Sequence, residues 1–132
     1  MKYLLDTHVV LWVIASSHLL SQKARETIEN SENTIYTSSI SIWEISLKYK
    51  LGKLKISGFK PAQIPEFLET SKIEIIPLEA DEASSYNSLV ETHHKDPFDR
   101  MLIWQAIKRK LTIISKDSEM KRYKLQGLKT LW

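Results

Sequence analysis

Residues 34–47 read TIYTSSISIWEISL, and this stretch changes from a strand pattern to a helix pattern within a few residues. Residues 34–37 have the β-branched and aromatic content of a short strand. Ser38 or Ser39 then caps a helix, which we predict from about residue 40 to residue 51. A strand that leads directly into a helix is a repeating unit of α/β folds.

The same alternation of strands and helices extends through the rest of the chain. We predict further strands at residues 2–5, 73–78, 112–115 and 128–132. We predict further helices at residues 9–15, 21–30, 64–71, 80–93, 97–110 and 119–123, with a loop at 52–66. Such alternation implies parallel strands joined by helical crossovers. The predicted fold is a three-layer α/β/α sandwich with a parallel sheet of about five strands, in one domain over residues 1–132.

The composition is that of an ordinary globular domain and excludes several kinds of site. Of 132 residues, 42% are hydrophobic and 27% are charged. The chain has no cysteine, which excludes disulfides and thiolate metal sites. The apolar stretch at residues 9–15 is too short to span a membrane, and the N-terminal segment makes a poor signal peptide. We therefore expect a soluble, cytoplasmic protein.

Lysine and arginine gather in two runs, although the formal net charge is only +3. One run covers residues 48–55 and the other covers residues 108–129. Basic clusters attract phosphate backbones, but the ordinary alternative is a solvated helix face. The two runs agree with a nucleic-acid partner without establishing one.

Four carboxylates are predicted to meet at the carboxyl edge of the sheet, where ligands bind in open α/β folds. Asp6 directly follows the first strand, and Asp117 lies two residues beyond Ser115 at the end of the fourth. Glu44 lies in the helix that leaves the second strand, and Asp99 lies in the first turn of the helix before the fourth. Mg²⁺ prefers oxygen ligands, and two ions about 4 Å apart can clamp the attacking and leaving oxygens of a phosphodiester.

Three of these acids also have a purely structural explanation. Asp6 and Asp117 could cap the helices that follow them. Asp99 lies three residues after Asp96, so this pair could form a capping box at the start of its helix. The sequence leaves both explanations open for each of them.

Glu44 is harder to explain structurally, because it is the only charged residue from Ile35 to Leu47. Its helix is apolar on most sides, and an unpaired buried carboxylate is unfavourable. An ion pair with Lys48, one helical turn later, is the simple alternative to a functional role.

A few polar residues near the strand ends are weaker candidates. His8 could touch a substrate phosphate, although a polar residue at a helix start is more common. Ser39 and Ser115 could orient waters or ligands, although capping is the more common role for serine at such positions.

Four short blocks of the chain, taken in order, resemble those of PIN domains. They are Leu4–His8, Ser38–Ile45, His94–Ile103 and Ile113–Asp117. The resemblance covers essentially the whole chain and is strongest to the PIN-domain toxins of bacterial toxin–antitoxin pairs, the VapC type. By motif match, the family's acids correspond to Asp6, Glu44, Asp99 and Asp117, which the resemblance makes catalytic and metal-binding residues. Asp96, Ser39, Ser115, His8 and Arg100 are possible auxiliary residues.

The resemblance implies a Mg²⁺- or Mn²⁺-dependent endoribonuclease that acts on RNA, forms homodimers and has a cognate antitoxin protein. The alternative is a non-catalytic RNA-binding or interaction module of the PIN fold. A phosphate-receiving signalling domain would need paired acids after the first strand. A haloacid-type phosphatase would need Asp-x-Asp, where this chain has Asp6-Thr7-His8. Both of these fit poorly.

Overall fold

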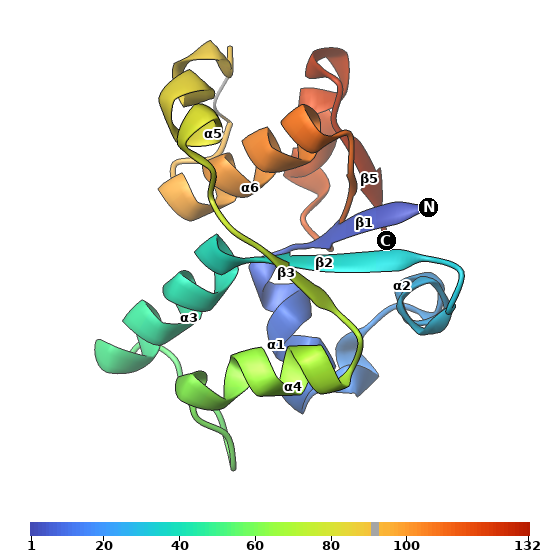
Figure 1. The fold of residues 1–132 in the computed structure, drawn as a ribbon, viewed down its shortest axis with the longest axis vertical. Coiled ribbons are helices and arrows are strands. Elements are labelled where there is room, and N and C mark those ends of the chain that lie inside the picture. Colours follow the sequence, from blue (N-terminus) through green and yellow to red (C-terminus); the bar gives the residue numbers. More distant parts are fainter. Residues whose placement is uncertain (91–92) are drawn as a thin grey trace.

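The computed structural model describes residues 1–90 and 93–132 and has at its centre a parallel sheet of five strands (Figure 1). The strand order is β3-β2-β1-β4-β5, and every neighbouring pair is parallel. The strands are β1 (Lys2–Leu5), β2 (Thr34–Ser38), β3 (Glu74–Ile76), β4 (Thr112–Ile114) and β5 (Lys129–Leu131). The first strand is central, so that Tyr3 pairs with Ile35 on one side and Thr112 on the other.

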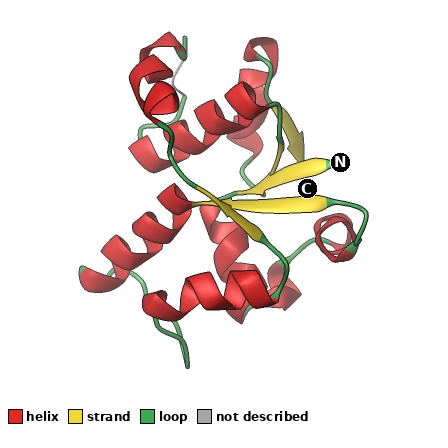
Figure 2. Cartoon of the chain, viewed as in Figure 1, coloured by secondary structure: helices red, strands yellow, loops and turns green. Residues whose placement is uncertain are grey.

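Helices cover both faces of this sheet, which confirms the predicted three-layer α/β/α class (Figure 2). The α-helices are α1 (Thr7–Ala15), α2 (Gln22–Glu29), α3 (Ser39–Lys50), α4 (Ile64–Thr70), α5 (Ala80–Ser85) and α6 (Pro97–Arg109). Short 3-10 helices are η1 (Ser17–Leu19), η2 (Pro61–Gln63), η3 (Tyr86–Ser88) and η4 (Ser118–Gln126). Within the described residues, no helix combines the length and apolar character needed to cross a membrane.

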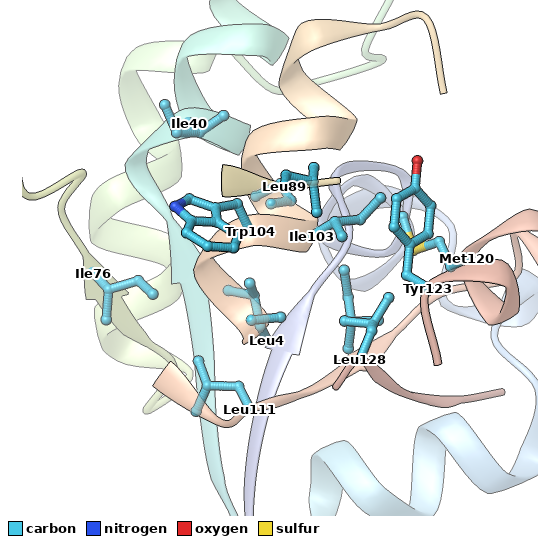
Figure 3. Packing of buried hydrophobic residues seen from close by; sticks show 13 residues of the cluster. Leu4, Ile40, Ile76, Leu89, Ile103, Trp104, Leu111, Met120, Tyr123 and Leu128 are labelled. Atoms are coloured by element: carbon cyan, nitrogen blue, oxygen red, sulfur yellow. The ribbon is translucent and has the colours of Figure 1, made fainter. Parts of the chain in front are cut away.

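Alternating side chains of the central strands supply two separate hydrophobic cores. Tyr3 and Leu5 point to one face, where they pack with residues of α1, α2 and α4. Leu4 points to the other face, where it packs with residues of α6 and η4. Figure 3 shows this second core, in which Leu4 lies among Trp104, Ile103 and Tyr123. The period-two alternation along β1 therefore holds a helical layer on each face.

One predicted helix is wrong in extent. The predicted helix over residues 80–93 ends as α5 at Ser85, and η3 then leads to Leu89, which is buried in the core. The hydroxyls of Ser84 and Ser85 both donate to the carbonyl oxygen of Asp81. Such side-chain bonds compete with the helical backbone, and serine and asparagine are poor helix formers. The last part of that prediction includes residues 91–92, which lie outside the described residues.

The other differences concern boundaries and helix type. The third strand is shorter than predicted, because Pro77 follows it and has no N–H for the sheet. The predicted helix at 119–123 is the longer 3-10 helix η4, and the predicted loop at 52–66 contains η2. Helix ends elsewhere move by one or two residues, as expected of such assignments.

The carboxyl edge of the sheet is where helices begin. Asp6 caps α1, Ser38 caps α3 and Asp117 caps η4, each through a side-chain oxygen that accepts a backbone N–H. Of the two serines considered as the cap of α3, Ser38 has that role. The helix α6 runs in the opposite sense along the sheet, because it leads into β4, and so its first turn also lies at this edge.

Candidate functional site

A cavity of about 300 Å³ lies at this edge and is lined by four carboxylates. They are Asp6 from the end of β1, Glu44 from α3, and Asp96 and Asp99 from the start of α6. Segments far apart in the sequence therefore bring three of the four predicted acids together. The fourth, Asp117, does not line this cavity.

Asp6 is held rigidly by its neighbours. Its side chain is almost fully buried, with 2% of the residue exposed. The amide of Thr7 donates to Oδ1 over 2.8 Å, and the hydroxyl of Ser115 donates to Oδ2 over 2.6 Å. Asp6 is thus a helix cap that also lines the cavity, so its capping role does not exclude a functional one.

His8 also faces Asp6, and its hydrogen bonds define its tautomer. Nε2 accepts the backbone N–H of Lys116 over 3.1 Å, so this nitrogen carries a lone pair. The ring proton therefore lies on Nδ1, which is 3.2 Å from Oδ2 of Asp6. His8 thereby links the end of β4 to the carboxylate at the end of β1.

Glu44 has one oxygen paired and one oxygen free. Only 3% of the residue is exposed. Lys48 donates to Oε2, so the ion pair that the sequence offered as an alternative is formed. The other oxygen, Oε1, is buried and has no hydrogen-bond partner among the described residues. A buried carboxylate oxygen without a partner is unfavourable. The ion pair with Lys48 therefore explains how Oε2 is accommodated but leaves Oε1 unexplained.

Asp99 is where the burial and the negative charge of the cavity act most strongly. Burial, and then the charges of Asp6, Asp96 and Glu44, raise the pKa of Asp99 from 3.8 to about 7. Asp96 has a capping role as well, because its Oδ1 accepts the amide N–H of Phe98 over 2.8 Å. A carboxyl group with so high a pKa is typical of functional sites.

Asp117 does not line the cavity, and its contacts are with Ser115 and His94. Its backbone N–H donates to the hydroxyl of Ser115, which in turn donates to Asp6. Its Oδ2 is 2.6 Å from Nε2 of His94, a buried side chain. The Ser115 hydroxyl therefore connects Asp117 to Asp6.

The orientation of His94 is determined by Tyr123. The tyrosine hydroxyl accepts the backbone N–H groups of His93 and His94, so its own proton is left to donate to Nδ1 of His94 over 3.1 Å. Nε2 then carries the ring proton and donates it to Asp117. This chain of contacts was not predicted from the sequence, because His94 and Tyr123 are far apart in it and carry no spacing signal.

The remaining predicted residues contribute less to the cavity. Ser39 begins α3 and does not line the cavity. Arg100 also lies outside the lining, and its guanidinium donates to the carbonyl oxygen of Lys95. Lys48 does line the cavity, and the hydrogen bond to Glu44 raises the pKa of its ammonium.

The donor set of the cavity suits a hard divalent cation. Its acids offer only carboxylate oxygens, the ligands that Mg²⁺ and Mn²⁺ prefer. The unpaired Oε1 of Glu44 and the elevated pKa of Asp99 both indicate that the negative charge of the cavity is not fully balanced by positive charge. Within residues 1–90 and 93–132, however, no three Asp, Glu or His side chains are close enough to share an ion as they stand. Binding would therefore require side chains to move.

A second hollow, of about 410 Å³, adjoins Asp117 and is basic. Lys23 from α2, Lys116 from the end of β4 and Lys121 from η4 line it. In the described part of the chain, none of the three lysines forms an ion pair with a carboxylate. Ser115, which lines this hollow, donates to Asp6 in the lining of the acidic cavity.

Comparisons with known proteins identify the architecture. The VapBC2 structure from Rickettsia felis, bound to a DNA fragment from its promoter, matches with a TM-score of 0.70 and 24% identity, covering 99% of this chain and 98% of that one. The DNA-bound VapBC structure from Salmonella typhimurium matches with a TM-score of 0.68 and 17% identity, covering 99% and 97%. FitAcB from Neisseria gonorrhoeae matches with a TM-score of 0.59 and 21% identity, covering 98% and 96%.

These structural similarities establish the fold, and the sequence comparison establishes the family. No curated protein matches the chain in sequence. The family model described as PIN domain matches residues 3–125, which include every acid of the cavity and Asp117. The chain therefore belongs to the PIN-domain family.

Proposed function

We propose that this protein is a Mg²⁺- or Mn²⁺-dependent endoribonuclease. The observation that carries the proposal is the convergence of Asp6, Glu44 and Asp99 on one cavity, where Glu44 keeps a buried oxygen without a partner. Convergent carboxylates in a chain without cysteine favour metal-assisted phosphodiester hydrolysis over nucleophilic catalysis by a thiol.

In this proposal, Asp6, Glu44 and Asp99 would hold the ion, and Asp117, which Ser115 links to Asp6, would be the fourth acid. When bound, a divalent ion supplies Lewis-acid chemistry to a water molecule and to the scissile phosphate. Ser115, Thr7 and His8 keep Asp6 in place through the bonds described above. His94 holds Asp117, and its ring proton is available to the oxygen that it contacts.

The basic hollow supports RNA as the substrate. Lys23, Lys116 and Lys121 have no carboxylate partner among the described residues, and lysine contacts to phosphates position a strand without reading its sequence. A polyanion held in this hollow would lie beside Asp117 and Ser115, and Ser115 is in contact with Asp6 of the acidic cavity. The arrangement fits cleavage within a chain rather than at a buried end.

Cleavage of labelled RNA by the purified protein tests the activity. We expect internal cuts in the presence of Mn²⁺ and none in excess EDTA. Loss of partners in the outer shell of a metal site typically reduces activity about 10- to 100-fold, so Asp6→Asn should reduce it by more than about 100-fold. Asp96→Asn keeps a capping oxygen and should retain more activity than Asp6→Asn. Undiminished cleavage in EDTA would rule out the metal-dependent mechanism.

The second candidate function is a non-catalytic RNA-binding module of the same fold. The observation in its favour is the ion pair of Lys48 with Glu44, which occupies one of the carboxylates needed for a metal. A protein of this kind would bind the labelled RNA, with or without Mn²⁺, and leave it intact. The same experiment therefore separates the two functions.

We further propose that the protein is the toxin of a toxin–antitoxin pair and forms homodimers. Related folds occur in structures described as VapBC and as a toxin–antitoxin complex from Klebsiella pneumoniae. Beside the cavity, Trp43 is 59% exposed and packs edge-to-face against Phe98 at 5.1 Å, an apolar surface suited to a protein partner. Expression without a partner should arrest growth, whereas Asp6→Asn should be harmless. Unimpaired growth with the active wild type would contradict the toxin role.

A further inference from the structure

We propose that Lys48 is the resident counter-ion of the acidic cavity and that its ammonium competes with the divalent ion for the carboxylates. The inference rests on the proposed function, since it concerns the ion of that same site. It assigns to Lys48 a role in determining metal affinity, in addition to its contact within α3.

The geometry places the ammonium group among the acids. Nζ of Lys48 bonds to Oε2 of Glu44 and lies 3.9 Å from Oδ2 of Asp96. Both acids line the cavity, and so does Lys48 itself. Of the two lysines in the lining, Lys48 forms these ion pairs, whereas Lys53 forms none among the described residues.

The charges of the lining explain why one ammonium is insufficient. Four carboxylates face the cavity, and Lys48 directly contacts one of them and approaches a second. The buried Oε1 of Glu44 remains without a partner even though Oε2 is paired. A single positive charge therefore relieves part of the repulsion, and a divalent ion would relieve more of it.

The two cations compete at Glu44. A divalent ion that took Oε2 would displace Lys48, and one that took the free Oε1 would be repelled by an ammonium on the same carboxylate. The lysine can leave, because its side chain is 40% exposed and sits on a flexible stem. Metal binding is then an exchange, and its affinity is lowered by the free energy of the ion pair that it breaks.

Direct measurement of Mn²⁺ binding tests this exchange. Titrations followed by electron paramagnetic resonance, without RNA, should be made on the wild type, Lys48→Met, Lys48→Arg and Lys53→Met. Coupling between sites typically changes an affinity by a factor of about 5 to 150, and we expect Lys48→Met to bind Mn²⁺ tighter by a factor in that range. Lys48→Arg keeps the charge and should remain near the wild type. Lys53→Met removes the same charge from the cavity rim and should have a smaller effect than Lys48→Met.

Thermal melts give a second readout that a merely structural role would not produce. In EDTA, Lys48→Met should melt below the wild type, because the acids lose their counter-ion. In millimolar Mn²⁺, it should show the larger rise in melting temperature. A lysine that only stabilises α3 would produce the first effect without the second.

The outcomes separate this inference from the proposed function. Equal or weaker Mn²⁺ binding by Lys48→Met than by the wild type overturns the role of Lys48 and leaves the nuclease proposal standing. Tighter binding by Lys48→Met, in a protein whose wild type cleaves no RNA, supports the exchange and rejects the nuclease. Absence of Mn²⁺ binding in every variant overturns both.

Discussion

Asp99 shows how one residue can be unfavourable for folding and useful for function. Burial and three neighbouring acids raise its pKa to about 7, so the folded protein holds a proton there over a range in which the unfolded chain has lost it. A residue that only capped α6 would not need this position, since Asp96 already accepts the N–H of Phe98. The repulsion at Asp99 is therefore what a cation would relieve.

The pH dependence of stability tests this account of Asp99. Below its ordinary pKa of 3.8, Asp99 is protonated in both the folded and the unfolded protein, so it carries no charge that would destabilise the fold. As the pH rises towards about 7, the folded protein binds more protons than the unfolded chain, so the free energy of unfolding falls. Without metal, wild type should lose stability over this interval relative to Asp99→Asn, as measured by urea unfolding at a series of pH values. Asp81→Asn, an exposed control, should track the wild type.

A bound divalent ion should make the wild type more stable than Asp99→Asn, which is the opposite of the order expected without metal. At neutral pH in EDTA, Asp99→Asn should be at least as stable as the wild type, because one like charge has gone. An ion at 100 times its dissociation constant stabilises the folded state by about 2.7 kcal/mol, and the mutant should gain much less than that from Mn²⁺. Thermal melts of both proteins measure the effect. A wild-type midpoint that ignores millimolar Mn²⁺, together with a weaker Asp99→Asn, would return Asp99 to a capping role.

At the scale of elements, η4 is tied to the segment before α6 by one tyrosine. Tyr123 lies in η4 and is fully buried, and its hydroxyl accepts two backbone N–H groups while it orients His94. That contact determines which nitrogen of His94 faces Asp117. Packing between two elements therefore positions a carboxylate at the N-cap of one of them.

Tyr123→Phe should lower both the stability of the fold and the rate of RNA cleavage. Unsatisfied buried donors destabilise a protein by about 1–3 kcal/mol each, and we expect a loss of about that size in the free energy of unfolding, measured in urea. RNA cleavage should also fall by about 10- to 100-fold if Asp117 acts in the site, since His94 would lose its orienting partner. Tyr36→Phe is the matched control, because no hydrogen bond of its hydroxyl occurs among the described residues. Unchanged stability in Tyr123→Phe would show that the two amides find other partners.

At the scale of the molecule, the parallel sheet separates two regions of charge along one edge. The acids surround the first cavity, and Lys23, Lys116 and Lys121 surround the hollow on the other side of Ser115. The formal net charge of +3 conceals this separation, because it averages over the whole surface. An RNA strand held by the lysines would be brought to the acids.

The salt dependence of RNA binding tests this path. For single strands, each phosphate contact contributes about 0.7 to the slope of log affinity against log salt concentration. In an Asp6→Asn background, replacing Lys23, Lys116 and Lys121 with Gln should reduce that slope by about 2. A control triple, in which Gln replaces Lys2, Lys108 and Lys110, removes the same charge near the amino edge and should change the slope less. Equal effects of the two triples would exclude the hollow as the RNA path.

The sequence by itself determined the class of fold and the edge at which the site lies. Local patterns are sufficient there, because a strand followed by a capped helix is defined by neighbours within a few residues, as at Asp6 and at residues 34–47. Residues 80–93 show the limit of such patterns, because burial of Leu89 and the serine side chains ended α5 early.

Only the tertiary structure decided how the acids are paired and charged. It placed Asp99 beside Asp6 and gave Glu44 one free oxygen, but it turned Asp117 towards His94. These features depend on contacts between segments far apart in the sequence, such as Ser115 with Asp6. Burial and Coulomb interactions act through space, so a pattern of neighbouring residues carries no information about them.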